Sequence, residues 1–135
     1  MEMQMNAPVI RLIWIFLFIP LVGFCQTPAG TYSSLRYNSE SGDLNGYELT
    51  FIPTDSGVKV VVQIAEDGIN EVHLASVDET GATSNFSITL DDGSKVEFTM
   101  KCSSARCRGT YTWQRAIVKI SLEKHPSYWS RQKSP

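Results

Sequence analysis

The sequence has few residues of the kinds that perform catalysis near neutral pH. It contains only two histidines, His73 and His125, and no Gly-x-Ser-x-Gly segment of the kind that marks a serine hydrolase accompanies them. Glu71 and His73 are two residues apart, which places both on one face of a strand. We expect that face to be polar and His73 to be an exposed strand histidine. The sequence therefore predicts a protein that is not an enzyme.

Cysteine is also scarce, with three residues in the chain and no Cys-x-x-Cys pair. A structural zinc site needs four nitrogen or sulfur ligands, and the few candidates are scattered along the sequence. We therefore expect no metal site and no cofactor. Cys102 and Cys107 are the two cysteines of the presumed domain, and in an exported chain such a pair predicts a disulfide. It closes a small loop and contributes about 2 kcal/mol to stability.

The chain lacks an apolar run long enough to remain in a membrane. The longest run, from Leu12 to Phe24, has 13 residues, whereas a span needs about 20. It follows Arg11 and has the length of a signal-peptide core. We expect a signal peptide at residues 1–25, cleaved after Cys25, and export to the periplasm or the extracellular space. The alternative is a lipid anchor at Cys25, but bulky Phe24 stands where a lipoprotein box has a small residue, which favours cleavage.

The net charge is small, −2, so the total gives no reason to expect nucleic acid or an anionic membrane as a partner. The charge is nevertheless unevenly distributed along the chain. Residues 26–97 contain 3 basic and 12 acidic residues, a balance of −9, whereas residues 98–135 contain 8 basic and 1 acidic, a balance of +7. The C-terminal strands are therefore the candidate surface for an anionic partner.

Helical periodicity is absent, and strand-length segments with alternating polarity take its place. Turn residues such as Asp-Gly and Asn-Gly separate them, which is typical of hairpins. The expected organisation is a linker at 26–30, one domain at 31–124 and a polar tail at 125–135. The fold class is all-β, an up-and-down eight-stranded antiparallel barrel, with a β-sandwich as the alternative. The expected strands are 31–37, 45–52, 58–65, 70–77, 84–90, 95–102, 107–113 and 116–123.

The cysteine pair also predicts a strand register. If Cys102 faces Cys107, Phe98 faces Tyr111 on the apolar side and Lys101 faces Arg108 on the polar side. The polar side and the adjoining loops then gather basic residues. The candidate partner-binding residues are Lys101, Arg106, Arg108, Arg115 and Lys119.

The leading functional expectation is non-catalytic binding of a protein or an anionic molecule through the outer surface. An inhibitor of a secreted enzyme is one form of it; a basic target enzyme would instead bind the acidic residues Glu66, Asp67, Glu71, Asp78 and Glu79. The alternative is a carrier that holds a small apolar ligand inside the barrel. Its candidate pocket residues are the aromatic side chains expected to face inward, Tyr37, Tyr47, Phe98, Tyr111 and Trp113.

The first expected strand opens with Gly30-Thr31-Tyr32. This segment resembles the Gly-x-Trp start of lipocalin-like and avidin-like barrels, with tyrosine in place of tryptophan. The resemblance implies a barrel in which the glycine lets the chain approach the barrel floor. It also implies a basic residue from late in the chain beside the aromatic ring, and Lys124 is the candidate.

Overall fold

The structure is a computed structural model that describes residues 29–66 and 69–131. The signal peptide expected at residues 1–25, with Cys25, lies outside the described residues, as does most of the linker. Within the described ranges, no helix combines the length and the apolar character needed to cross a bilayer.

The described residues form ten strands and one short helix, and the eight expected strands are all present. The expected strand 31–37 is divided into two strands. A further short strand, which the sequence did not predict, lies at Asp78–Thr80, before the expected strand 84–90. The elements are β1 (Gly30–Ser33), β2 (Arg36–Tyr37), β3 (Leu44–Thr54), β4 (Gly57–Glu66), β5 (Ile69–Ser76), β6 (Asp78–Thr80), β7 (Thr83–Thr89), β8 (Lys95–Cys102), β9 (Arg106–Trp113), β10 (Ala116–Lys124) and α1 (Tyr128–Arg131).

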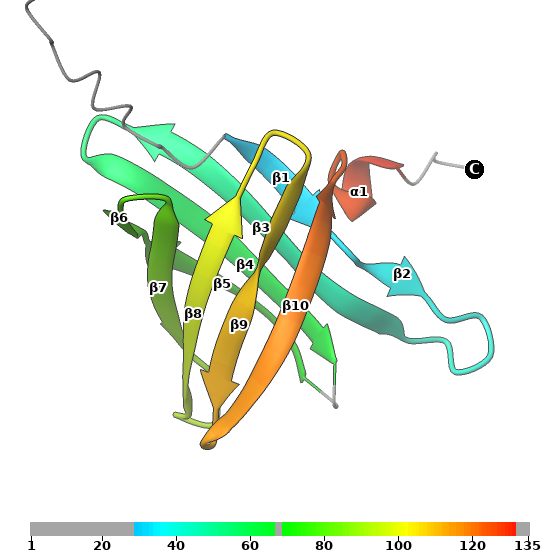
Figure 1. Cartoon of the computed structure of the whole chain (residues 1–135). Coiled ribbons are helices and arrows are strands. Elements are labelled where there is room, and N and C mark those ends of the chain that lie inside the picture. Colours follow the sequence, from blue (N-terminus) through cyan, green and yellow to red (C-terminus); the bar gives the residue numbers. More distant parts are fainter. Residues whose placement is uncertain (1–28, 67–68, 132–135) are drawn as a thin grey trace, which may run out of the picture.

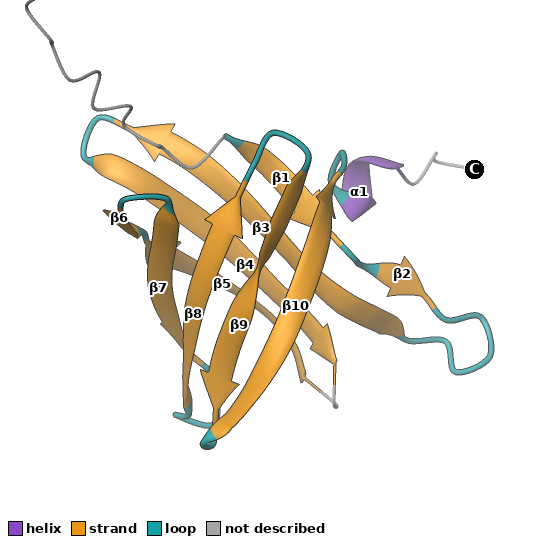
Figure 2. Ribbon diagram, in the orientation of Figure 1, coloured by secondary structure: helices purple, strands orange, loops and turns teal. Residues whose placement is uncertain are grey.

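The strands form one antiparallel sheet that curls into a nearly closed barrel, which confirms the expected fold class. The order is β5-β4-β3-β1-β10-β9-β8-β7-β6, with β2 paired to the start of β3. Strand β1 joins the two halves of the sheet because it pairs with both β3 and β10. Figure 1 shows β3 and β4 passing obliquely behind β8–β10, and Figure 2 shows how little of the chain is helical.

The barrel is open along one line, which we call the seam. The two strands beside it, β5 and β7, lie close together, but no ladder of backbone hydrogen bonds joins them. The short strand β6 pairs with β7 and continues that edge of the sheet. The seam is thus the place in the described barrel where β5 and β7 lie side by side without pairing, since β6 pairs only with the start of β7.

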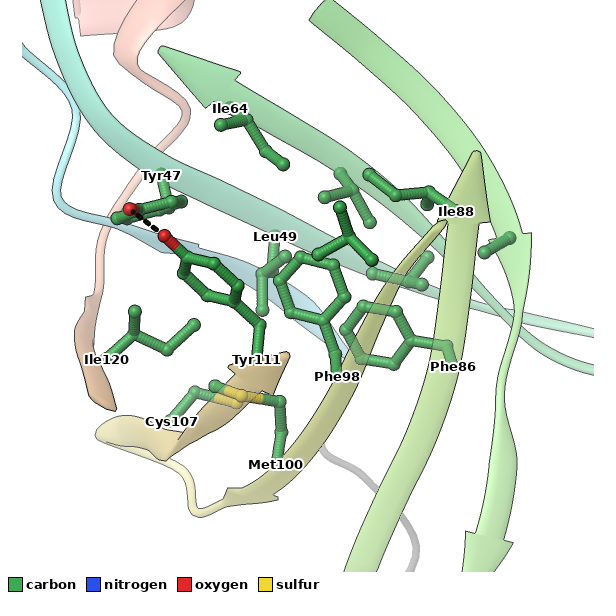
Figure 3. Packing of buried hydrophobic residues seen from close by; sticks show 14 of the residues in the cluster. Tyr47, Leu49, Ile64, Phe86, Ile88, Phe98, Met100, Cys107, Tyr111 and Ile120 are labelled. Atoms are coloured by element: carbon green, nitrogen blue, oxygen red, sulfur yellow. Dashed lines mark hydrogen bonds between the residues drawn. The ribbon is translucent and has the colours of Figure 1, made fainter. Parts of the chain in front are cut away.

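Alternating apolar residues fill the barrel interior, as the period of two predicts. Phe86 and Phe98 stack with ring centroids 4.8 Å apart. Beside them the hydroxyls of Tyr47 and Tyr111 form a hydrogen bond of 2.9 Å (Figure 3). The polar tips of these two buried rings therefore satisfy each other and do not require water inside the core.

The barrel floor has the arrangement that the Gly30-Thr31-Tyr32 resemblance implied. The Lys124 ammonium lies 5.7 Å from the centre of the fully buried Tyr32 ring and donates to the Ala29 carbonyl at 3.0 Å. Gly30 has a φ of 124°, and a Cβ there would lie 3.0 Å from the Lys124 side chain. The backbone angle therefore favours glycine at this position, and the Lys124 side chain packs against its open side. Tyr32 Oη also donates to the Ser103 carbonyl at 2.6 Å.

The tail predicted at residues 125–135 packs, in its described part, on the outer face of β3 and β4. The Glu48 carboxylate is buried and accepts hydrogen bonds from Ser127 Oγ at 2.6 Å and from the Tyr128 backbone N–H at 2.8 Å. Tyr128 belongs to a small second apolar cluster with Leu35 and Ala65. The carboxylate therefore fixes the start of α1 against the sheet.

Candidate functional site

The β8–β9 hairpin has the predicted register throughout. Cys102 lies opposite Cys107, with Cα atoms 4.0 Å apart, and the two form a disulfide. Two residues further in, Met100 lies opposite Gly109, and Lys101 lies opposite Arg108 on the outer face. The disulfide is typical of an oxidising compartment. It also holds the Lys101–Arg108 pair at a fixed end of the hairpin.

Gly109 is a packing requirement of this hairpin. A Cβ at Gly109 would lie 2.0 Å from the Thr99 carbonyl oxygen and 2.7 Å from Met100 Sδ. The Met100 side chain is fully buried in the space that a larger residue at position 109 would need. The register that places Lys101 beside Arg108 is therefore fixed from inside the barrel as well as by the disulfide.

An open groove lies on the outer surface at the disulfide end of the hairpin. We call it the basic groove, because Lys101 and Arg108 line it together with Ser103 and Ala105 from the β8–β9 loop and Ala82 from the β6–β7 turn. Both basic side chains are exposed. Among the described residues, neither Lys101 nor Arg108 forms an ion pair. Two adjacent like charges on a sheet are mildly unfavourable. The acidic residue nearest in the register, Glu123, lies opposite Arg106 and pairs with it.

The structure assigns different positions to the other three basic candidates. Arg106 borders the groove but forms an ion pair with Glu123 on β10. Lys119 is exposed on the same outer face, opposite Thr110. Arg115 lies in the β9–β10 turn, at the end of the hairpin away from the disulfide. The groove charge therefore comes from Lys101 and Arg108, with Lys119 as a neighbour.

Arg115 sits in a two-residue turn with a constrained backbone. Gln114 and Arg115 have φ angles of 48° and 68°, the positive values that a tight hairpin turn requires at both central positions. The turn joins β9 and β10 at the end of β9 that is opposite to the disulfide. Arg115 is thus separated from Lys101 and Arg108 by the length of the hairpin.

The five aromatic pocket candidates do not share one cavity. Tyr37 was expected to face inward, and this is wrong: it lies on β2, beyond the barrel, and is 58 % exposed. The chain leaves the barrel wall after β1, so the alternation does not continue to position 37. Tyr47, Tyr111 and Trp113 border a space of about 10 Å³ at one barrel end. That is about the volume that a cavity needs to hold a single water molecule, so the space is too small for a ligand.

His73 lies where the sequence did not predict it. The expectation of an exposed strand histidine on a polar outer face is wrong, because the register pairs Val62 with His73 and Ile64 with Glu71, so all four share the inner side of the sheet. The His73 and Glu71 side chains are only 18 % and 19 % exposed, and they meet Asp91 at the seam. The apolar neighbour Val72 points outward and is exposed.

The acidic candidates are not gathered into one surface. Glu66 ends β4 and Glu71 lies near the start of β5, whereas Asp78 and Glu79 lie on β6, beyond the other end of β5. Asp67 lies outside the described residues. No single acidic face therefore unites the described members of this set.

Comparison with known proteins adds no assignment to this geometry. The fold defines the chain as a small antiparallel β-barrel with an open seam. No family model matches it, and neither a curated protein nor a solved structure does. The functional argument therefore rests on the residues of this chain.

Proposed function

We propose that this chain is an exported, non-catalytic binding protein whose basic groove contacts an acidic surface of a partner protein. The observation that carries the proposal is the exposed Lys101–Arg108 pair, neither member of which forms an ion pair within the described residues. A charged pair of this kind favours association with a surface of opposite sign. The unequal charge of the two halves of the chain points to the same region.

The shape of the region favours a macromolecule over a small anion. The Lys101–Arg108 pair lies on a sheet face rather than in an enclosed cavity, and its neighbours on that face include Thr99, Thr110 and Ser121. Hydroxyl-bearing side chains beside basic ones are suited to carboxylates presented from a second surface. The rigid hairpin keeps the two charges in place before binding, which lowers the entropic cost of association.

Export is proposed from the apolar run at Leu12 to Phe24 and is supported by the Cys102–Cys107 disulfide. The small-ligand carrier finds less support, because the side chains of the described interior pack against one another.

The test compares two variants of equal net charge. Lys101→Glu/Arg108→Glu reverses the groove, and Arg36→Glu/Lys59→Glu reverses two basic residues elsewhere. Binding is measured by interferometry on immobilised poly-glutamate, with heparin and anionic phospholipid vesicles as separate surfaces. We expect the wild type and the control to bind poly-glutamate most tightly, and the groove variant to lose at least about tenfold in affinity.

Equal losses in the two variants would refute the groove as the binding surface. Preference of the wild type for heparin or vesicles would refute an acidic protein surface as the partner. Raising the salt concentration serves as an internal check, because contacts between exposed charges weaken as ionic strength rises.

A further inference from the structure

We propose that Glu71, His73 and Asp91 form a binding site for a divalent transition-metal ion of the zinc class, which bridges the seam of the barrel. One ligand atom from each of the three side chains lies within 4.8 Å of the other two. The site is separate from the basic groove and does not depend on the proposed function. The sequence alone predicts no metal, because Asp91 is 20 residues from Glu71 and only the closing of the barrel brings them together.

Strand geometry aligns the first two ligands. Glu71 and His73 are two residues apart on β5, so both side chains leave the strand on the same side. His73 Nε2 lies 2.6 Å from Glu71 Oε2. Because β5 is an edge strand, these side chains reach the unpaired seam rather than the packed interior. Two residue types that coordinate transition metals are thus partly buried and point to one position.

The third ligand comes from the other side of the seam. Asp91 follows β7, and its backbone N–H donates to Glu71 Oε2 at 3.1 Å, which is a direct link across the seam. The turn is held by Asp92, whose carboxylate accepts hydrogen bonds from the Ser94 N–H at 2.8 Å and from the Ser94 hydroxyl. The turn is therefore fixed in a position that brings Asp91 to the Glu71–His73 pair.

The donor set selects the class of ion. One imidazole nitrogen and two carboxylates suit Zn²⁺, Ni²⁺ or Cu²⁺, whereas Mg²⁺ and Ca²⁺ prefer oxygen ligands alone. Ligands around tetrahedral zinc, at the usual bond lengths of 2.0–2.2 Å, lie about 3.3–3.6 Å from one another. The present separations, from 2.6 Å between His73 Nε2 and Glu71 Oε2 to at most 4.8 Å, bracket this range. Three protein ligands leave a fourth position for water, and the two carboxylates neutralise the ion.

The position of the site gives the ion a structural consequence. The ligands come from β5 and from the turn after β7, the two sides of the seam that no backbone ladder joins. An ion held by both sides would replace the missing hydrogen bonds with metal–ligand bonds. Because the ligands are brought together only in the folded chain, binding of the ion stabilises the fold.

The experiment measures Zn²⁺ binding and thermal unfolding of the purified, disulfide-bonded protein. All variants carry Cys25→Ser so that this thiol does not bind the metal. We expect one Zn²⁺ per chain by calorimetry, and a Tm rise of roughly 10 °C at a hundredfold excess over Kd. We expect Mg²⁺ and Ca²⁺ to leave the Tm unchanged.

Matched variants separate this site from adventitious binding. His73→Ala is expected to weaken Zn²⁺ binding by at least about tenfold, and Asp91→Asn, which keeps the size of the side chain, to weaken it in the same direction. His125→Ala removes the other histidine and is expected to bind Zn²⁺ like the parent. Absence of saturable binding, or equal binding by the His73 and His125 variants, would overturn the proposal. Asp91→Asn keeps the test valid if His73→Ala does not fold.

Discussion

The two sides of the barrel are built differently. On the β8–β9–β10 side, hydrogen-bonded ladders run the length of the strands and a disulfide closes the hairpin end. At the seam, β5 and β7 lie close together without a ladder, and side chains such as Glu71 and His73 reach the space between them. The paired side presents a charged surface on a hydrogen-bonded sheet. At the seam, the side chains of β5 meet residues from the other side only because the barrel curls round.

The difference shows how a small barrel separates rigidity from binding chemistry. Where both edges of a strand are paired, the side chains on its inner face are committed to packing. Where an edge is left free, polar side chains such as His73 are tolerated on the inner side because solvent and polar groups reach them. We therefore expect substitutions on the paired side to cost more stability than those at the seam.

The largest effect is expected for Gly109→Ala on the paired side. The added methyl group would collide with the Thr99 carbonyl and with Met100, so the hairpin must separate or lose its register. Overpacking of this kind costs about 3 kcal/mol. Urea unfolding measures the loss, with Thr110→Ala on the outer face of the same strand as the control. A stability loss below about 1 kcal/mol would contradict the expectation that substitutions on the paired side are more destabilising than those at the seam.

A smaller effect is expected for Tyr32→Phe, which removes a link between the two halves of the sheet. The hydroxyl of Tyr32 donates to the Ser103 carbonyl, and its loss leaves that acceptor without this partner. The expected cost is about 1 kcal/mol near neutral pH. Thermal unfolding measures it. Tyr47→Phe is a matched comparison, because it removes a hydroxyl whose partner is another hydroxyl.

The same residue predicts an alkaline pH dependence. Burial raises the pKa of Tyr32 above its ordinary value of 10.0, so the folded state holds the phenolic proton more tightly than the unfolded state does. This contribution to stability is fully present below pH 10 and is lost as the pH rises through the raised pKa. Unfolding measured between pH 9 and 11 should show a decline that is shallower in Tyr32→Phe. Identical declines would remove Tyr32 as the cause.

The smallest effect is expected at the seam, for Val72→Thr/Leu74→Thr on the exposed face of β5. Both side chains are largely exposed, so their replacement removes little buried apolar area. Stability is expected to change by less than about 0.5 kcal/mol, while self-association falls because edge strands with apolar side chains promote it. Light scattering and urea unfolding give the two measurements. A large stability loss would show that the β5 edge is covered more extensively than the described residues indicate.

Much of the fold follows from short-range patterns. Turn residues and the period of two predicted the strands, and the cysteine pair predicted the pairing of Phe98 with Tyr111 and of Lys101 with Arg108. These features are predictable because each hairpin joins neighbours in sequence, and burial of one face permits only one register. The prediction that Tyr37 faces inward was wrong because the period of two was extended beyond the end of β1 at Ser33. The sequence shows no strong break at Ser34 and Leu35, where the chain leaves the barrel wall.

The candidate sites depended more on the tertiary structure. The Lys101–Arg108 pair was predictable because both residues belong to one hairpin. Arg106 differs from this pair because it forms an ion pair with Glu123 across the neighbouring β9–β10 hairpin. The polar alternation of Glu71 and His73 indicated an outer face, but the pairing of β5 with β4 places both on the inner side.

The sequence by itself therefore determined the strands, the C-terminal register and the uneven charge, since each depends on residues close together along the chain. The tertiary structure alone decided that the barrel stays open between β5 and β7, and that Asp91 meets Glu71 and His73 there. The physical reason is that closing a sheet brings its two edge strands together, and no local pattern records which side chains then meet.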